Sequence, residues 1–350
     1  MKRVVVDHFG GPEVLRIVEE EDPRPGRGEV LVKVLAAGVS FTDSQLRAGT
    51  YLPGAPKPPF TPGYELVGVV EALGPGCSRL RVGDRIGALT VWGADAERVC
   101  VPEAGVVDVP ADLDAGEVLS LLFPYMTSYQ VLHRMAKVKP GETVLVHGAA
   151  GRVGVAALEL GRVARLRQYG TASARDRTKV EALGAVAIDY QNEDFLARVR
   201  EDVGGVDVVV DSLGGPISLR SFRALRPGGR LVVFGRYDTI KDGHKDWPAV
   251  IKWYAAIATI WLWDKVSPRR HVYAYHVQKY RDKATRRDGA VGGEPMNADQ
   301  FREDFAVLVE LLRADKIHPV VAERLPLTEA RRAHEMLVSS AATGKIVLVP

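Results

Sequence analysis

The sequence has very few cysteines, with only Cys77 and Cys100 among its 350 residues. Two cysteines exclude a disulfide framework and the cysteine clusters that hold structural zinc. Long apolar runs are also absent. The longest, at residues 255–263, is too short to cross a bilayer, and the N-terminus lacks the apolar core of a signal peptide. We therefore expect a soluble protein of a reducing compartment, the cytoplasm.

An excess of charge of one sign is lacking as well. The 47 lysine and arginine residues nearly balance 44 aspartate and glutamate residues, which gives a net charge of +3. So small an excess, with no basic and aromatic motif, argues against a nucleic-acid partner. Apolar residues are plentiful: they make up 46% of the chain, and its length predicts two domains with sizeable cores.

The pattern of apolar residues changes along the chain. Residues 1–120 read as β-rich, with strands such as 30–34 and 66–70 separated by glycine turns. From residue 124 strands alternate with helices, which predicts an α/β domain with a doubly wound parallel sheet. The strands expected there are 143–148, 168–171, 186–188, 206–211 and 229–235, and the helices include 155–165, 179–183 and 301–313. A last strand, 344–349, is expected to return to the N-terminal β domain.

The segment 143–165 predicts a dinucleotide site. A buried strand is followed by a sharp glycine turn and then by a helix. In that order the turn brings backbone close to a pyrophosphate, and the helix N-terminus attracts its negative charge. Ala149 replaces the first glycine of G-x-G-x-x-G, but the place of the motif between strand and helix fits the mechanism. A structural turn without a ligand is the alternative. The residues expected at the pyrophosphate are Ala150, Gly151, Arg152, Val153 and Gly154.

The cofactor is predicted to be NADPH. About twenty residues after the turn, an NAD site places an acid for the 2′-hydroxyl of the ribose. Residues 170–175 contain no acid, and Ser173, Arg175 and Lys179 offer hydrogen-bond donors and positive charge. These groups suit a 2′-phosphate.

One segment departs from the alternation of strands and helices. Residues 265–287 carry ten lysine, arginine or histidine residues against one aspartate, with three tyrosines between them. We expect a solvated surface excursion there. A lid over the substrate cleft and a contact with an anionic membrane surface are the alternatives.

Four motifs stand out along the chain: residues 62–70 (PGYELVGVV), 83–86 (GDRI), 146–151 (VHGAAG) and 211–215 (DSLGG). Together they resemble the medium-chain dehydrogenase/reductase superfamily over essentially the whole chain, and its zinc-free quinone oxidoreductase branch in particular. Residues 170–174 (GTASA) and 188–190 (IDY) are especially similar to the synaptic vesicle membrane protein subgroup and its bacterial relatives. One departure is Arg152, where the family usually has a second glycine; Arg152 either points at cofactor phosphate or reshapes the turn.

The resemblance implies a domain plan. It consists of a GroES-like β domain at 1–123 that is completed by 298–350, a Rossmann domain at 124–264, and a basic insertion at 265–297. Zinc-free relatives commonly pair the last Rossmann strand across a two-fold axis, which buries the sheet edge. A homodimer is therefore expected.

The resemblance also bears on metal and substrate. Zinc-dependent members place a cysteine and a histidine as ligands where this chain has Ser40 and Tyr64, and neither side chain is a usual zinc ligand. Without zinc to polarise an isolated carbonyl, the substrate is expected to spread negative charge itself, as quinones and alkenes conjugated to a carbonyl do. We therefore expect an NADPH-dependent quinone or enone reductase.

The remaining site residues follow from the resemblance and from the ends of strands. Tyr51, in a Gly-x-Tyr turn, is the candidate donor to the substrate oxygen, with a role as an apolar wall equally open. Thr127 matches a threonine beside the nicotinamide, Ser40 is a candidate contact of cofactor or substrate, and Tyr190 matches a position that touches the adenosine phosphate. His147 is expected to be a core residue. Two strands end at Leu213, Gly214, Phe234 and Gly235, where a doubly wound sheet binds its ligand.

Two rival functions stay open. One is an enoyl or polyketide-type reductase, if the aromatic segment 247–263 lines a long acyl pocket. The other is a weakly catalytic, NADPH-binding interaction protein, if the basic segment blocks the nicotinamide pocket.

Overall fold

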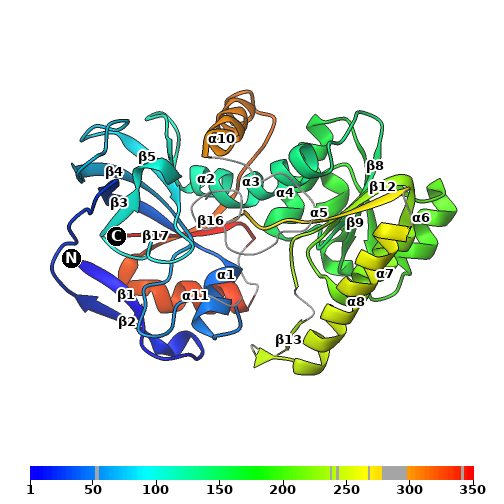
Figure 1. The fold of residues 1–350 in the computed structure, drawn as a ribbon, viewed down its shortest axis with the longest axis horizontal. Coiled ribbons are helices and arrows are strands. Elements are labelled where there is room, and N and C mark those ends of the chain that lie inside the picture. Colours follow the sequence, from blue (N-terminus) through cyan, green and yellow to red (C-terminus); the bar gives the residue numbers. More distant parts are fainter. Residues whose placement is uncertain (52–54, 237–238, 242–243, 267–268, 278–297, 340–342) are drawn as a thin grey trace. The chain divides into compact units, whose positions relative to one another are not determined.

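The computed structural model describes residues 1–51, 55–236, 239–241, 244–266, 269–277, 298–339 and 343–350. They form two compact units (Figure 1). Unit 1 comprises Met1–Phe123, Met296–Val309 and Pro319–Pro350, and unit 2 comprises Pro124–Pro295 and Glu310–His318. Residues 310–318, which we expected in the β domain, therefore group with unit 2.

Unit 1 is a GroES-like domain built on a seven-stranded sheet. Its strand order is β16–β17–β3–β4–β5–β7, and β6 pairs with β3. β16 and β17 run parallel, and the other pairs are antiparallel. Because β17 pairs with β3, the predicted return of the C-terminal strand is confirmed. The strands are β3 (Glu29–Val39), β4 (Glu65–Leu73), β5 (Arg85–Leu89), β6 (Arg98–Pro102), β7 (Val106–Asp108), β16 (Val321–Pro326) and β17 (Lys345–Val349), beside a separate hairpin of β1 (Lys2–Val6) and β2 (Leu15–Glu19).

The core of unit 1 follows from alternation along its strands. In β3, Val30, Val32 and Val34 point to one face and are buried, because successive side chains of a strand alternate between faces. They pack with buried residues of β4, β5 and β17 and with Ala330 and Ala333 of helix α11. The helices are α1 (Phe41–Arg47), α2 (Ala115–Ser120), α10 (Ala298–Arg313, whose last turn belongs to unit 2) and α11 (Ala330–Val338), with short turns at η1 (Pro12–Val14), η2 (Glu103–Gly105) and η7 (Leu327–Glu329).

Unit 2 is a Rossmann domain with a doubly wound sheet. All its neighbouring strands are parallel, in the order β10–β9–β8–β11–β12–β15, so the chain order reverses between β8 and β11. A ligand of such a sheet binds outside the carboxyl ends of the strands at this reversal. The strands are β8 (Thr143–His147), β9 (Arg167–Ala172), β10 (Val186–Asp189), β11 (Val206–Asp211), β12 (Leu225–Val233) and β15 (Arg270–Ala274), and a separate short hairpin joins β13 (Ile240–Lys241) to β14 (His244–Lys245).

The helices of unit 2 lie between these strands in the chain. A continuous helical segment runs through η3 (Leu121–Tyr125), α3 (Met126–Tyr129) and η4 (Gln130–Met135), and α3 packs on α4. Leu145, Val209 and Leu231 of three adjacent strands form the centre of the core and are fully buried. The other helices are α4 (Arg152–Val163), α5 (Arg177–Ala182), α6 (Phe195–Val203), α7 (Gly215–Ala224) and α8 (Trp247–Val266), with a short turn at η5 (Ala174–Asp176).

Residues 270–274 correct the expectation of a surface excursion at 265–297. They form β15, which pairs with β12. Tyr275, just after β15, is buried, and its hydroxyl donates to Oε1 of Gln130 at 2.7 Å. The many cations of this segment hid its alternating pattern, because an edge strand tolerates charged side chains. Residues 278–297, the rest of the predicted insertion, lie outside the described residues.

The aromatic segment 247–263 belongs to α8. This helix packs along α7, with the rings of Phe222 and Trp263 at a centroid distance of 5.8 Å (Figure 1). Its other face is open: Trp247, Ile251 and Leu262 are 65%, 67% and 60% exposed. Within the described residues, no helix is both long and apolar enough to cross a membrane.

A buried contact between α1 and α11 makes unit 1 sensitive to acid. The guanidinium of Arg47 donates to Nδ1 of His334 at 2.8 Å, and both side chains are buried. Burial, together with the nearby charge of Arg47, lowers the pKa of His334 to about 3. Between about pH 3 and pH 6.5 the imidazole is therefore neutral in the folded chain and protonated in the unfolded chain.

The expected consequence is a loss of stability as the pH falls from 6.5 towards 3. In this window the unfolded chain binds a proton that the folded chain does not, so acid favours unfolding. From pH 6.5 to pH 5 the free energy of unfolding attributable to His334 should fall by about 2 kcal/mol. His334→Gln keeps an acceptor for Arg47 and does not titrate. Urea unfolding at pH 7.5 and pH 5 should show a smaller acid loss in this variant; equal losses in variant and wild type would contradict the assignment.

Candidate functional site

The turn between β8 and α4 has the geometry of a dinucleotide-binding turn. Gly148 ends the strand with φ of +66°, a left-handed conformation that suits glycine. The N–H of Gly151 donates to the carbonyl of Gly148 at 3.0 Å, which closes the turn, and the helix begins at Arg152. A Cβ on Gly154 would overlap the carbonyl oxygen of Gly148 and the backbone of Ala149. The third glycine of the motif is therefore required for the turn to lie against the helix.

Ala149, the departure from the glycine motif, is accommodated by a glycine on the next strand. The Cβ of Ala149 would lie 2.6 Å from a Cβ on Gly170 of β9. Ala149 is fully buried, and its N–H donates to the carbonyl of Thr171 at 3.0 Å. The alanine therefore fits because residue 170 lacks a side chain.

The N-terminus of α4 has no side-chain cap. Its N-cap is Gly151, which offers no side chain to accept from the first N–H groups of the helix. Lys179 of α5 reaches the same turn, where its Nζ donates to the carbonyl of Ala150 at 2.9 Å. Burial lowers the pKa of Lys179, the carboxylate of Asp176 opposes this shift, and the positive charge of Arg152 adds to it. Helix dipole, Lys179 and Arg152 together favour a negatively charged group.

The structure places an acid among the residues predicted to bind a 2′-phosphate. Asp176 Oδ2 accepts from Ser173 Oγ at 2.6 Å and lies 3.4 Å from Nε of Arg175. The hydrogen bond from Ser173 holds the pKa of Asp176 below its usual range. Asp176 lies one residue beyond the acid-free stretch 170–175 on which the prediction of NADPH rests.

The carboxyl ends of the other strands supply the remaining predicted residues of unit 2. Tyr190 follows β10, is exposed, and its N–H donates to the carbonyl of Ala172 at 3.2 Å. After β11, the buried Asp211 accepts through Oδ1 from the N–H groups of Leu213 and Gly214 at 2.8 and 3.0 Å. A Cβ on Gly214 would lie 2.8 Å from the carbonyl oxygen of Gly235. The loops after β11 and β12 are thus in contact.

Phe234 and Gly235 lie where the sequence predicts, at the end of β12. The N–H of Phe234 donates to the carbonyl of Asp211 at 2.9 Å, and a Cβ on Gly235 would overlap the carbonyl of Ser212. Glycine at 235 lets the two strand ends approach each other closely.

Thr127 is fixed against α4 and keeps its hydroxyl unpaired. Its neighbour Ser128 donates to the carbonyl of Val153 at 2.8 Å, and the hydroxyl of Tyr125 donates to Glu159 of α4 at 2.5 Å. Thr127 itself is 3% exposed, and among the described residues its Oγ1 has no hydrogen-bond partner. A buried polar atom without a partner is a position at which a ligand gains a hydrogen bond.

His147 is a core residue. Its ring nitrogens lie 3.1 Å from Thr171 Oγ1 and 2.9 Å from Ser221 Oγ, and its ring packs edge-on against Phe195. Burial lowers its pKa, which keeps the imidazole neutral at physiological pH.

In unit 1, Ser40 and Tyr64 are both buried, and Ser40 belongs to a polar cluster. Ser40 is the N-cap of α1, and both its N–H and its Oγ donate to Oδ2 of Asp43 at 2.7 Å. Oδ1 of Asp43 accepts from the N–H of Gly63 at 3.1 Å. Tyr64 is buried, with its ring 4.5 Å from that of Phe123. Within the described residues, no three histidine, cysteine, aspartate or glutamate side chains gather in a way that suits a metal ion.

A buried ion pair, which was not predicted from the sequence, completes this cluster. Lys345 of β17 contacts Glu65 of β4, and both side chains are fully buried. Gly38 of β3 lies between them, and a Cβ there would overlap both side chains. Burial lowers the pKa of Lys345, and the nearby Asp43 carboxylate opposes this shift. Because the two residues are 280 positions apart in the sequence, no local motif predicts their contact.

Tyr51 is partly buried in unit 1. Its ring packs against an apolar cluster of Val6, Val14, Leu46 and Phe60. Residues 52–54, which follow it, lie outside the described residues. The packing fixes the ring and is compatible with both expected roles of Tyr51, donor and wall.

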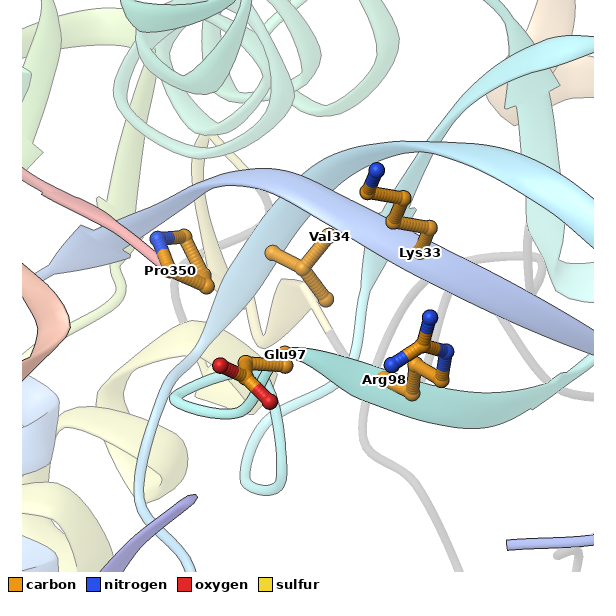
Figure 2. A pocket seen from close by; sticks show the side chains of 5 residues that line it. All are labelled: Lys33, Val34, Glu97, Arg98 and Pro350. Carbon is orange, nitrogen blue, oxygen red and sulfur yellow. The ribbon is translucent and has the colours of Figure 1, made fainter. Parts of the chain in front are cut away.

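A small pocket in unit 1 does not add to the site. It is lined by Lys33, Val34, Glu97, Arg98 and Pro350, and Figure 2 shows Lys33 and Arg98 on neighbouring strands. Arg98 donates to Glu71 at 2.7 Å, and Glu97 accepts from the N–H of Lys2 at 2.7 Å. Arg98 and Glu97 are therefore already paired within the fold.

Comparison with known families agrees with the two folds. Residues 26–111 match the family described as alcohol dehydrogenase GroES-like domain, and residues 183–348 match the family described as zinc-binding dehydrogenase.

Full-length relatives are oxidoreductases and vesicle proteins. The chain is 30% identical to the quinone oxidoreductase of Lama guanicoe, over 100% of this chain and 97% of the relative. It is 31% identical to the synaptic vesicle membrane protein VAT-1 homolog of Mus musculus, over 100% of this chain and 84% of that protein.

Solved structures with the same fold include two reductases. Escherichia coli quinone oxidoreductase complexed with NADPH has a TM-score of 0.82 and 27% identity, with 100% of both chains covered. A 2-haloacrylate reductase has a TM-score of 0.82 and 29% identity, over 100% of this chain and 99% of that one.

Removal of one partner of the buried ion pair should destabilise unit 1. Lys345→Met leaves Glu65 as a buried charge without a counterion, which costs about 3–5 kcal/mol of unfolding free energy. Lys345→Met combined with Glu65→Leu removes both charges and should recover most of this loss. Urea unfolding of the wild type, the single variant and the double variant measures it; a double variant less stable than the single one would contradict the pairing.

Proposed function

Since this chain belongs to the quinone oxidoreductase family of the medium-chain dehydrogenase/reductase superfamily, we propose that it is an NADPH-dependent reductase of quinones and of alkenes conjugated to a carbonyl. The observation that carries the proposal is the turn from Gly148 to Gly154, with the uncapped N-terminus of α4 behind it. This combination of close backbone and helix dipole suits a pyrophosphate.

The residues of unit 2 fit the other parts of the cofactor. Ser173 and Arg175 are the proposed donors for the 2′-phosphate, and Lys179, whose Nζ reaches the carbonyl of Ala150, adds positive charge. Tyr190 follows β10, its N–H donates to the carbonyl of Ala172, and its exposed side chain is the proposed contact of the adenosine phosphate. We propose that the buried hydroxyl of Thr127, which has no hydrogen-bond partner among the described residues, bonds the nicotinamide amide. When bound, NADPH supplies the hydride for the reaction.

The proposed substrate class follows from the chemistry of the Ser40 and Tyr64 side chains. Ser40 and Tyr64 are not zinc ligands by chemistry, and the hydroxyl of Ser40 is engaged by Asp43. We therefore propose a reaction that needs no metal, on substrates that delocalise the negative charge which a hydride brings. The quinone oxidoreductase and 2-haloacrylate reductase names of its relatives fit this class.

The protein's task at the substrate is then to donate one hydrogen bond to the developing oxyanion, and Tyr51 is the proposed donor. Its side chain packs against the apolar cluster that contains Leu46 and Phe60, which limits the movement of the ring. The free thiols of Cys77 and Cys100 are consistent with a cytoplasmic setting.

We also propose that the protein is a homodimer. β15 is the outermost strand of its sheet in the part of the chain that the structure describes, so its outer edge is available for a second copy. α8 contacts β15, so it lies at the same end of the sheet as this edge. Its exposed apolar face would be covered in such a pair.

Cofactor preference tests the assignment of Arg175. We expect NADPH to bind at least tenfold more tightly than NADH, because charge-assisted hydrogen bonds to phosphate exceed neutral ones. Arg175→Ala should reduce this preference about fivefold, a value discounted for the exposure of the side chain. Arg177→Ala, an exposed neighbour bonded to Glu193, is the matched control. Equal affinities of the wild type for the two nucleotides, measured by calorimetry, would exclude the assignment.

Tyr51→Phe tests the proposed donor. The change keeps the ring and its packing and removes only the hydroxyl, so thermal stability should be unchanged. Loss of an oxyanion donor lowers turnover by roughly a hundredfold. Enones should lose more than quinones, which are better electrophiles. Wild-type rates of Tyr51→Phe on both substrate classes would show that Tyr51 is only a wall of the pocket.

Oligomeric state tests the proposed pairing. Light scattering at micromolar concentration should give twice the mass of the 38.1 kDa chain. Ile251→Lys with Leu262→Lys places two charges on the exposed face of α8 and should shift the mass to that of a monomer. A monomeric wild type would refute the pairing.

A further inference from the structure

Asp176 is an acid at the carboxyl end of β9 that the proposed function leaves without a role. It ends the short turn η5, and its N–H donates to the carbonyl of Ser173 at 2.9 Å. Its Oδ2 accepts from Ser173 Oγ at 2.6 Å and lies 3.4 Å from Nε of Arg175. The two donors proposed for the 2′-phosphate therefore already share one carboxylate oxygen.

Two cations lie near Asp176. Arg175 is 75% exposed and Lys179 is half-buried with its Nζ on the carbonyl of Ala150. Lys179 and Arg175 both hold the pKa of Asp176 down, after the larger effect of the Ser173 hydrogen bond, so the carboxylate is charged at neutral pH. A 2′-phosphate that approaches Ser173 and Arg175 meets this negative charge and needs the same donors.

We infer that Asp176 is a specificity-determining residue: its carboxylate competes with the 2′-phosphate for Ser173 and Arg175 and so limits the preference for NADPH over NADH. The inference rests on the proposed function, because it takes NADPH as the cofactor. An acid near the adenine ribose favours a 2′-hydroxyl over a phosphate, and the cations of this turn favour the opposite. The balance between the negative charge of Asp176 and these cations sets the preference for NADPH over NADH.

The first experiment removes the charge of Asp176 and keeps its shape. Asp176→Asn retains an amide oxygen that accepts from Ser173, so the turn should persist, and a thermal melt checks this. Wild type and variant are titrated by calorimetry with NADPH, NADH, 2′,5′-ADP and 5′-AMP. We expect Asp176→Asn to bind NADPH and 2′,5′-ADP about tenfold more tightly, because one unit charge beside a doubly charged phosphate is removed. The affinities for NADH and 5′-AMP should stay within about twofold.

A matched control separates local competition from general electrostatics. Glu181 lies on the helix that follows the turn and pairs with Arg177 at 3.7 Å. Glu181→Gln removes the same unit of charge from the same region without touching Ser173 or Arg175. It should leave the ratio of the 2′,5′-ADP and 5′-AMP affinities unchanged.

A second pair of variants tests the sharing of Arg175. If Asp176 holds the guanidinium, Arg175→Ala should lose more affinity for 2′,5′-ADP in the Asp176→Asn background than in the wild type. Equal losses in the two backgrounds would mean that the two side chains act independently, which contradicts competition for a shared donor.

The outcomes distinguish this inference from the proposed function. A wild type that binds neither NADPH nor 2′,5′-ADP refutes the proposed cofactor, and the inference falls with it. A wild type that binds NADPH, with Asp176→Asn equal to it or weaker, leaves the proposed function standing and overturns the inference. Weaker binding would mean that Asp176 positions Ser173 and Arg175 for the phosphate.

Discussion

The close approach of backbone to backbone at the end of β8 is the constraint on which the candidate cofactor site depends. Gly154 must lack a side chain for α4 to begin against the carbonyl of Gly148, and Gly170 must lack one for Ala149 to be buried. Together they bring the uncapped N–H groups of α4, Lys179 and the turn of Ser173 into one region at the carboxyl edge of the sheet. Positive charge and free donors at that edge are what a dinucleotide with an extra phosphate requires.

Unit 1 contains a cluster of buried charged side chains. Asp43 is bonded by Ser40 and Gly63, and Glu65 is paired with Lys345 across Gly38. Removal of these groups from water is costly unless they are paired, so the cluster fixes the arrangement of β3, β4 and β17. It also uses the hydroxyl of Ser40 within the fold. Ser40 stands where the resemblance places a zinc ligand, and its hydroxyl is thus bonded to Asp43.

Much of the fold could be predicted because its signals are local. The parallel strands of unit 2 are short apolar runs between glycines, and each lies within a few residues of its predicted position. The return of β17 to the β domain was also predictable, from the last apolar alternation of the chain. β15 was missed because a high density of arginine and histidine resembles a solvated loop, although its alternation allows an edge strand.

The candidate site was predictable only where its signals are local in the sequence. The glycine turn and the cations after β9 are visible in sequence, because each lies at a fixed offset from a strand. The acid-free stretch 170–175 ends one residue before Asp176. Only the structure shows that the carboxylate of Asp176 accepts a hydrogen bond from Ser173. The pair of Glu65 and Lys345 joins residues far apart in the chain, so no spacing rule could find it. The role of Tyr51 depends on the orientation of a hydroxyl toward a substrate, which neither composition nor packing decides.

The most direct test of the account is the oxidation of NADPH by the purified protein, followed by absorbance with a quinone and with an enone, in the presence of a metal chelator. The account predicts oxidation that depends on the substrate, persists with the chelator, and is faster with NADPH than with NADH at equal subsaturating concentration. Absence of oxidation with both substrate classes, or its loss on chelation, would contradict the account.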